Sequence, residues 1–296
     1  MTMLPGTLDG PNLPLPIGRS RFDLPLGRLL LRIEDLPTPW DPFVAQHYLP
    51  FAQPCGQDKP HLTIRCREDL GSDEIPLPPP GEMPIFDFGR GAGDLRTVRS
   101  HWSRGSIDAT RGEAEITFTS RHYLPLRVSL ENFLRIASQL VQTRHEAFLL
   151  HAAGIVEGGR CFLFFGPHEA GKSTIASQSQ PRAALSDDLV IVDGAEPSVV
   201  SFPVPFWGVF APASRARGEF AVAAAFRLRE GEQVKLTPLP AALAIATLHA
   251  NMPFVNDLQL DPGEMTALLH RFVKRVPVFD LHGVDSPGMW QHLSTL

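Results

Sequence analysis

Residues 160–174 read RCFLFFGPHEAGKST, which joins an apolar run to a glycine-bounded loop and then to a lysine and two hydroxyl residues. The run Cys161 to Phe165 contains only apolar side chains, which predicts a strand in a sheet that is covered on both faces. Ser173 to Gln180 is predicted to form a short helix that ends before Pro181, since proline cannot continue a helix. A strand, a glycine loop and a helix in this order predict an α/β fold.

The loop matches the Walker A pattern Gly-x-x-x-x-Gly-Lys-Ser/Thr in the strand-then-helix context that this motif requires. Backbone amides of such a loop wrap around phosphate oxygens, and the following helix adds partial positive charge at its N-terminal end. We expect Lys172 to bridge the terminal phosphates and Ser173 to ligate Mg²⁺, which implies ATP and Mg²⁺ as cofactors. The expected nucleotide-binding residues are Gly166, Pro167, His168, Glu169, Ala170, Gly171, Lys172, Ser173 and Thr174.

Two residues inside the loop, His168 and Glu169, are larger and more polar than the small residues commonly found there. A carboxylate close to phosphate is unfavourable by Coulomb's law unless it points to solvent. We therefore expect Glu169 to face outward. The alternative role for Glu169 is to orient a water molecule bound to Mg²⁺.

Two adjacent aspartates, Asp187 and Asp188, stand before the apolar segment Leu189 to Val192, which we predict to be the strand after the loop helix. Adjacent carboxylates repel each other unless a cation or a proton lies between them. Phosphoryl transfer requires a metal and a group that accepts the proton of the attacking hydroxyl. One aspartate is therefore a candidate for Mg²⁺ and the other for a general base. The alternative is an acidic turn without a chemical role.

Several motifs together resemble the C-terminal kinase domain of HPr kinase/phosphorylase, and most of all the poorly characterised HPr-kinase-like proteins. The motifs are the strand His151 to Gly154, the Walker A loop, the Asp187-Asp188 pair, the turn Pro205 to Gly208 and the late strand Val276 to Phe279. The resemblance extends over residues 145–295 and implies a core with a mixed sheet similar to phosphoenolpyruvate carboxykinase. This chain departs from the family pattern at His168 and Glu169, and its aspartates follow the loop slightly earlier.

The resemblance implies a role for each matching residue. It implies Lys172 and Ser173 on phosphate and Mg²⁺, Asp187 as the general base, Asp188 on the metal and His151 near the reacting phosphate. Without the resemblance, His151 would be interpreted as an ordinary strand histidine. The expected catalytic residues are therefore Asp187, His151 and Lys172, and the expected metal ligands are Ser173 and Asp188.

The first part of the chain is rich in proline and has a different character. Segments such as Ile75 to Pro80 exclude helix interiors and central strands. Between them lie short β-like runs: Arg28 to Ile33, His61 to Cys66, Ile85 to Phe88 and Ala114 to Phe118. We predict a strand-rich α+β accessory domain at residues 1–125, followed by the nucleotide-binding domain at 126–296.

The second domain is predicted to open with a helix whose N-cap is Ser129, because apolar residues then recur at helical spacing. Further predicted strands are Ala147 to Val156, Val222 to Leu228 and Val276 to Leu281. Further predicted helices are Pro240 to His249 and Glu264 to Lys274.

Composition narrows the class of protein. A net charge of −5 and a pI near 6.1 argue against a general nucleic-acid binder. The sequence contains neither a signal-peptide pattern at its start nor an apolar window of the roughly 18 residues that a membrane span needs. The 3 cysteines share no metal-ligand spacing. We therefore expect a soluble cytoplasmic protein with neither nucleic-acid nor membrane partners.

The function expected from these residues is an ATP- and Mg²⁺-dependent kinase that phosphorylates a hydroxyl, a serine of a protein or peptide. One alternative is an ATP-binding regulatory or assembly protein that transfers no phosphate. Another is a small-molecule kinase or carboxykinase-like enzyme. Arg215 and Arg217 are candidates for a clamp on the transferred group, and Trp207 for stacking on the base; the alternatives are solvated arginines and a packed tryptophan. The family resemblance implies a homo-oligomer.

Overall fold

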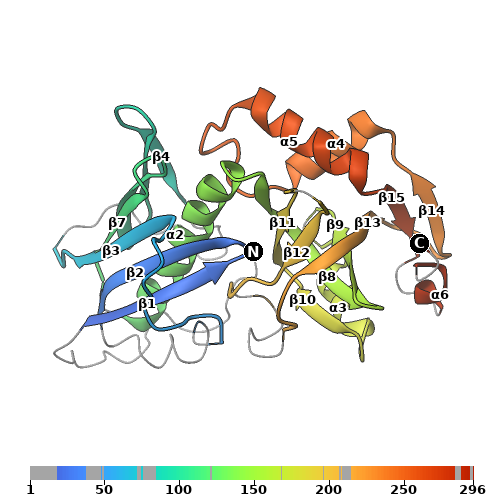
Figure 1. The fold of residues 1–296 in the computed structure, drawn as a ribbon, viewed down its shortest axis with the longest axis horizontal. Helices are drawn as coiled ribbons and strands as arrows, with labels where there is room; N and C mark the ends of the chain where they lie inside the picture. The colour runs from blue at the N-terminus through green and yellow to red at the C-terminus, as the bar shows by residue number, and fades with distance from the viewer. Residues whose placement is uncertain are drawn as a thin grey trace. The chain divides into compact units, whose positions relative to one another are not determined.

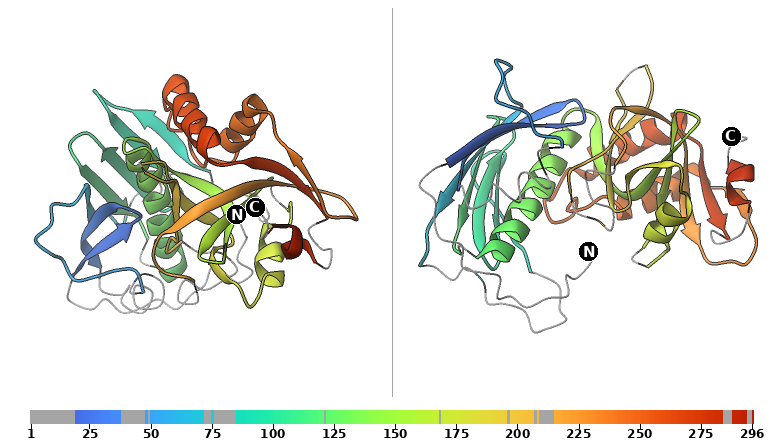
Figure 2. Two further views of the ribbon diagram at one scale, coloured as in Figure 1. Left: turned by 45° about the vertical axis from the view of Figure 1, so that its right-hand side comes forward. Right: turned by 90° about the horizontal axis from the view of Figure 1, so that it is seen from below.

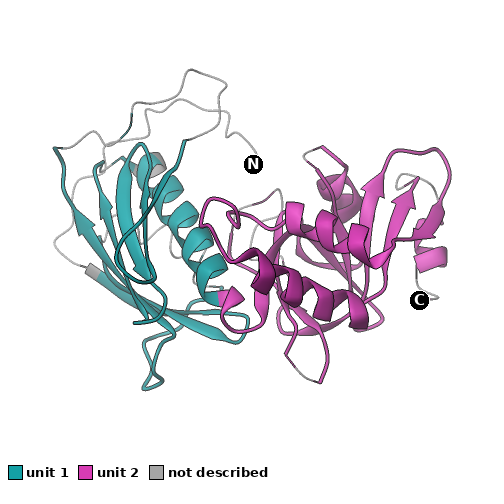
Figure 3. Ribbon diagram, turned by 90° about the horizontal axis from the view of Figure 1, so that it is seen from above, with its two compact units in different colours: residues 1–141 teal, residues 142–296 magenta. Residues whose placement is uncertain are grey.

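The computed structural model describes residues 19–37, 48, 50–71, 75, 85–120, 122–167, 169–195, 197–206, 208, 215–283, 288–293 and 296. The chain forms two compact units, Met1–Val141 and Gln142–Leu296 (Figure 3). From the sequence we placed the division at residues 125 and 126. The two units are divided at 141 and 142 instead because the long helix α2 (Tyr123–Thr143) packs on the sheet of the first unit, where the Phe133 ring lies over Gly105.

The first unit is a mixed sheet of seven strands in the order β1-β2-β3-β7-β6-β5-β4 (Figure 1). The β2–β3 and β3–β7 pairs are parallel and the other neighbours are antiparallel. Its strands are β1 (Arg19–Leu26), β2 (Leu29–Pro37), β3 (Leu62–Glu68), β4 (Asp87–Arg90), β5 (Leu95–Arg99), β6 (Ser103–Asp108) and β7 (Glu113–Phe118). The four runs expected from the sequence correspond to β2, β3, β4 and β7.

Strand β3 shows how this sheet divides its two faces. Leu62, Ile64 and Cys66 are buried, whereas the alternate residues Arg65 and Arg67 are exposed. On the exposed face, charged side chains of neighbouring strands form ion pairs, because side chains directly opposite across a ladder lie within reach of each other.

Helix α2 begins at Tyr123, ahead of Ser129, so our prediction of Ser129 as the N-cap was wrong. The reason is Pro125, which a helix tolerates in its first turn because the amide there has no partner within the helix. Ser129 lies inside the helix with 4% of its surface exposed.

The second unit is a mixed sheet of eight strands in the order β10-β8-β11-β12-β13-β15-β14, and β9 pairs with both β8 and β13. The strands are β8 (Ala147–Glu157), β9 (Arg160–Phe165), β10 (Ala183–Ser186), β11 (Leu189–Asp193), β12 (Val200–Phe202), β13 (Phe220–Arg229), β14 (Lys235–Pro238) and β15 (Val278–His282). Strands β9, β13 and β15 run parallel to one another, and their neighbours are antiparallel.

Helices cover both faces of this sheet (Figures 1 and 2). Cys161, Leu163 and Phe165 of β9 pack in a cluster with helices α4 (Ala241–Ala250) and α5 (Pro262–Arg275). The alternate residues Phe162 and Phe164 pack with α3 (Lys172–Gln178) and α6 (Met289–Leu293). The prediction of a mixed α/β fold, with β9 buried on both faces, is confirmed.

Several elements had no clear signal in the sequence: the strands β1, β5, β6, β10 and β14 and the helix α6. Helix α5 starts at Pro262, earlier than Glu264, because the Asp261 side chain caps it by accepting a hydrogen bond from the Glu264 amide at 2.8 Å. Within the described part of the chain, no helix combines the length and apolar character needed to cross a bilayer.

Candidate functional site

The loop between β9 and α3 leaves the sheet at the C-terminal end of a parallel strand. Gly171, which precedes α3, has a φ of 96°, a left-handed conformation that glycine adopts without steric cost. Glu169 has a φ of 66° and is exposed, so its carboxylate is at the surface, as we expected. His168 lies outside the described residues. Gly171 has no side chain to cap α3, so the amides of the first turn keep their capacity to bind an anion.

Lys172 reaches back from the start of α3 into this loop. Its Nζ donates hydrogen bonds to the carbonyl oxygens of Gly166 and Pro167, both at 2.8 Å, and the residue is buried. Burial lowers the pKa of the ammonium, and the nearby charge of Asp188 acts in the opposite direction. A buried ammonium that is held by neutral carbonyls rather than by a direct carboxylate contact remains able to exchange those carbonyls for a phosphate oxygen.

Asp187 and Asp188 occupy the break between β10 and β11. Both strands pair with β8, Ser186 lying opposite Gly154 and Leu189 opposite His151, so the two aspartates interrupt the ladder. The Ser186 hydroxyl accepts hydrogen bonds from the amides of Asp188 and Leu189, both at 3.2 Å, and this holds the turn. The short strand β10 therefore intervenes between α3 and the strand that we predicted to come next.

The carboxylate of Asp187 faces the start of α3, where Ser173 lies. Its Oδ2 accepts a hydrogen bond from the Ser173 hydroxyl at 3.3 Å, and only 2% of the residue is exposed. On its other side, Oδ1 lies 3.8 Å from a guanidinium nitrogen of Arg215. The predicted metal ligand Ser173 thus contacts Asp187 directly, although we had assigned the metal to Asp188.

Asp188 has a different neighbour and a different exposure. Its Oδ1 lies 3.0 Å from Nε2 of His151, and the two side chains are 21% and 31% exposed. The backbone amide of His151 donates to the carbonyl oxygen of Asn251 at 2.8 Å, which anchors the middle of β8 to the residue after α4. His151 and Asp188 therefore form a solvent-accessible pair beside the half-buried Ser173 and the buried Asp187.

The structure thus brings together every predicted catalytic and metal-binding residue: Lys172, Ser173, Asp187, Asp188 and His151. Thr174 is exposed on the first turn of α3. The sequence also pointed to the Pro205–Gly208 turn and to two arginines, of which Arg215 reaches the site and Arg217 is exposed. Trp207 lies outside the described residues. We predicted the turn that contains Gly208 but not a role for Gly208 in the site. A single glycine in a sequence gives no signal that it lies against Asp187.

Helix α3 is supported from the far side by the last helix. The indole Nε1 of Trp290 donates to the Ser179 hydroxyl at the end of α3, at 3.1 Å. The Trp290 ring also meets the rings of Phe162 and Phe164 edge-on. These contacts fix the helix that carries Lys172 and Ser173.

We asked whether these residues fit a bound Mg²⁺. Over the described ranges there is no group of three or more His, Cys, Asp and Glu side chains that could hold a metal by themselves. Mg²⁺ in nucleotide sites is bound by one or two protein oxygens, with phosphate oxygens and water completing the octahedron. A serine hydroxyl and a carboxylate, at 3.3 Å from each other, fit that requirement.

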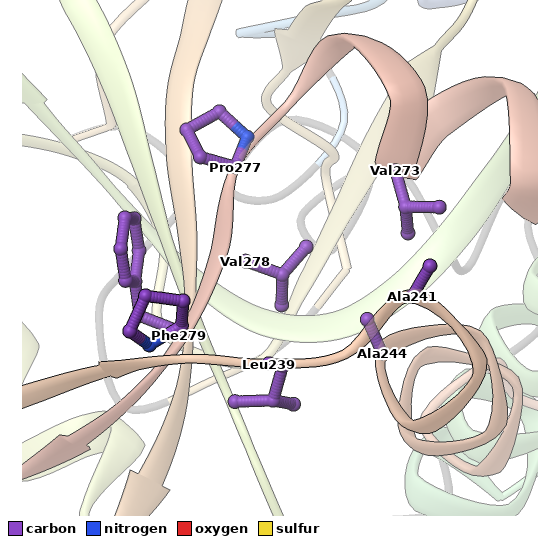
Figure 4. A pocket seen from close by; sticks show the side chains of 8 residues that line it. Leu239, Ala241, Ala244, Val273, Pro277, Val278 and Phe279 are labelled. Carbon is purple, nitrogen blue, oxygen red and sulfur yellow. The ribbon is translucent and has the colours of Figure 1, made fainter.

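An apolar cavity of about 190 Å³ lies elsewhere in this unit (Figure 4). It is lined by Pro238, Leu239, Ala241, Ala244, Val273, Pro277, Val278 and Phe279. None of the loop or aspartate residues contributes to it, and it offers no charged group. We therefore place the candidate site at the loop and not at this cavity.

No protein-family model and no curated protein matches the sequence. Among solved structures, one that matches is described as "Structure of the Hpr(Ser) kinase/phosphatase from Coxiella burnetii". The likeness has a TM-score of 0.31 and 9% sequence identity, and it covers 50% of this chain and 96% of that chain. A likeness this distant leaves the function to be argued from the residues of the site.

Proposed function

We propose that the second unit binds ATP with Mg²⁺ and transfers the terminal phosphoryl group to a hydroxyl, a serine of a protein or peptide. The observation that carries the proposal is the contact between the Ser173 hydroxyl and the Asp187 carboxylate at 3.3 Å, beside the buried Lys172. A phosphate loop and an aspartate pair that are separate in the sequence meet there. Phosphoryl transfer depends on such positioning of cations and carboxylates around the phosphates.

Each side chain has a task in this proposal. The amides of the loop and the ammonium of Lys172 hold the phosphate oxygens, and Ser173 with Asp187 holds the metal. A bound Mg²⁺ neutralises the charge that develops on the phosphate oxygens. We therefore exchange the roles that the family resemblance implied: Asp187, which contacts Ser173, takes the metal, and Asp188 becomes the base.

The His151–Asp188 pair suits the acceptor side of the reaction. Asp188 is partly exposed, so a substrate hydroxyl can approach it, and a carboxylate takes up the proton of that hydroxyl as the new P–O bond forms. The bond from phosphorus to the leaving oxygen of ADP breaks at the same time, and its electron pair stays with ADP. His151, at 3.0 Å from Asp188, orients the carboxylate toward the acceptor.

The binding step is tested by Lys172→Ala. Removing a charge-assisted contact to phosphate is expected to weaken Mg-ATP binding by roughly 10- to 100-fold. Calorimetry with Mg-ATP measures the loss, and Lys235→Ala, which removes an exposed lysine of β14, is the matched control and should bind like the wild type. Equal affinities of Lys172→Ala and wild type would rule out this site.

The transfer step is tested with labelled ATP and a lysate as the source of acceptors. The wild type should label an acceptor at a hydroxyl, whereas Asp188→Asn should retain Mg-ATP binding and lose at least about 100-fold in labelling rate, the usual contribution of a general base. Undiminished labelling by Asp188→Asn, with Asp187→Asn inactive, would return the role of the base to Asp187.

One observation favours a second function, nucleotide binding without transfer. Glu169 places an exposed carboxylate in the phosphate loop, in a left-handed conformation that is uncommon for residues other than glycine. Such a loop could regulate an assembly by binding ATP alone. Tight ATP binding without labelling of any acceptor would support this alternative.

A further inference from the structure

Arg215 is a charged residue that the proposed reaction has not used. Its side chain is fully buried, and one guanidinium nitrogen donates to the Val204 carbonyl oxygen at 2.6 Å. Arginine keeps its charge at every accessible pH, and a buried guanidinium is therefore stable only where an anion and hydrogen-bond acceptors surround it. Asp187 lies on the side of Arg215 that faces the site, at 3.8 Å.

The two oxygens of the Asp187 carboxylate face different partners. Oδ2 accepts from the Ser173 hydroxyl at 3.3 Å, whereas Oδ1 is turned to Arg215 at 3.8 Å. Gly208 closes the same side, since a Cβ added to it would lie 2.2 Å from Oδ1. No side chain larger than hydrogen fits at this position without displacing the carboxylate.

We propose that Arg215 and Gly208 form a rear support for Asp187, which holds Oδ1 so that Oδ2 is presented to the metal beside Ser173. This inference rests on the proposed function and assigns Arg215 as a positioning residue. Arg215 does not clamp the transferred phosphoryl group, because its side chain has no exposed surface with which to touch a ligand.

The distance between the charges supports positioning rather than neutralisation by a direct bond. At 3.8 Å the guanidinium attracts Oδ1 through space but is beyond hydrogen-bonding range of it, and a carboxylate oxygen has more than one lone pair with which to accept. The anchor on Val204 fixes the guanidinium itself. Groups that orient a metal ligand in this way commonly change metal affinity by about 10- to 100-fold when they are removed.

The test separates the contribution of Mg²⁺ to ATP affinity from the affinity for the nucleotide alone. ATP affinity is measured by calorimetry in excess Mg²⁺ and again in EDTA, and the ratio of the two affinities is the gain from the metal. In Arg215→Met this gain should fall by at least about tenfold, while the affinity in EDTA stays within about twofold of wild type. Arg215→Lys, which keeps a cation, should recover part of the gain.

Two further variants complete the experiment. Arg217→Met removes a nearby but exposed arginine and should retain the wild-type gain. Gly208→Ala pushes on Oδ1 without removing a charge and should lose the gain as Arg215→Met does, so it decides the matter if Arg215→Met fails to fold.

The possible outcomes separate this inference from the proposed function. A wild-type gain in both Arg215→Met and Gly208→Ala, together with weak ATP binding by Lys172→Ala, would overturn the rear support and leave the nucleotide site standing. Absence of ATP binding by the wild type would overturn both.

Discussion

Each unit contains a buried aspartate–arginine pair, and the two pairs are built differently. In the first unit, Arg32 donates two hydrogen bonds to Asp23, at 2.7 and 2.9 Å, and the amide of Gly56 donates a third at 2.9 Å. In the second unit, Arg215 stays at 3.8 Å from Asp187, whose other oxygen meets the Ser173 hydroxyl. Both aspartates are almost completely buried.

The difference separates a pair that serves the fold from a pair that lies in the proposed ligand site. The Asp23 carboxylate is held by a bidentate guanidinium and a backbone amide, which is the arrangement that stabilises a buried ion pair. It joins β1 to β2 and to the loop that carries Gly56. The Asp187 carboxylate instead meets a guanidinium at 3.8 Å and the Ser173 hydroxyl at 3.3 Å, and the side of Ser173 is the one on which we propose that it binds a metal.

Asp23→Asn should give the largest loss of stability. It leaves the Arg32 guanidinium without its anion, and breaking a buried pair costs about 3 kcal/mol. Amide hydrogen exchange of peptides from β1 to β3 should accelerate by about 100-fold, whereas peptides from β8 and β9 keep the wild-type rate. Mg-ATP affinity should not change. Equal acceleration in both units would contradict a role confined to the first sheet.

The same pair predicts an acid-sensitive component of stability. Hydrogen bonds from Arg32 lower the pKa of Asp23 to about 2, while an aspartate in an unfolded chain titrates near pH 4. A group with a lowered folded-state pKa stabilises fully above the unfolded pKa and loses its effect as pH falls through the folded pKa. The stability difference between wild type and Asp23→Asn should thus be constant above about pH 4 and shrink toward pH 2. A difference that grows on acidification would refute this.

Asp187→Asn should change stability far less than Asp23→Asn does. The amide still accepts from Ser173, and the lost partner is a cation at 3.8 Å, so we expect about 1 kcal/mol. The gain in ATP affinity from Mg²⁺ should nevertheless fall at least about tenfold. Calorimetry and hydrogen exchange of β10 and β11 measure the two effects, with the exposed Asp257→Asn as control. A loss of stability as large as that of Asp23→Asn would make Asp187 a structural residue.

An exposed ion pair should have the smallest effect. Arg67 and Glu115 are 2.6 Å from each other on the outer face of the first sheet, with side chains 63% and 41% exposed. Exposed pairs contribute only about 0–1 kcal/mol, and salt screens them. The free energy of unfolding of Arg67→Met, measured by urea denaturation, should therefore lie within about 0.5 kcal/mol of the wild-type value. A loss above about 1.5 kcal/mol would show that burial is not what separates this pair from Asp23–Arg32.

Part of the fold follows from local sequence. The apolar run of β9 predicted burial on both faces, and the glycine loop and the lysine after it placed the start of a helix, because period and turn chemistry act over a few residues. Elements that lack such signals were not predicted from the sequence. Strand β10 has only four residues. Helix α2 was predicted to begin at Ser129 because apolar residues recur at helical spacing from there, whereas the helix starts at Tyr123 and includes Pro125 in its first turn.

Part of the candidate site could likewise be predicted from the sequence, and part could not. Lys172 and Ser173 were assigned from the sequence, because the motif that names them is contiguous. Which aspartate faces Ser173 was not determined by sequence, since adjacent residues at a break in a ladder turn to different neighbours, and only the pairing of β10 and β11 with β8 sets those directions.

The sequence by itself thus determined the α/β class, the glycine loop between β9 and α3 and the acidic residues near it, because each depends on near neighbours in the chain. Tertiary structure alone decided that Asp187 lies between Ser173 and Arg215, and that Asp188 lies beside His151. The physical reason is that hydrogen bonds and Coulomb forces act over a few ångströms in space. Which residues come that close is fixed by the packing of a whole sheet and not by their order in the chain.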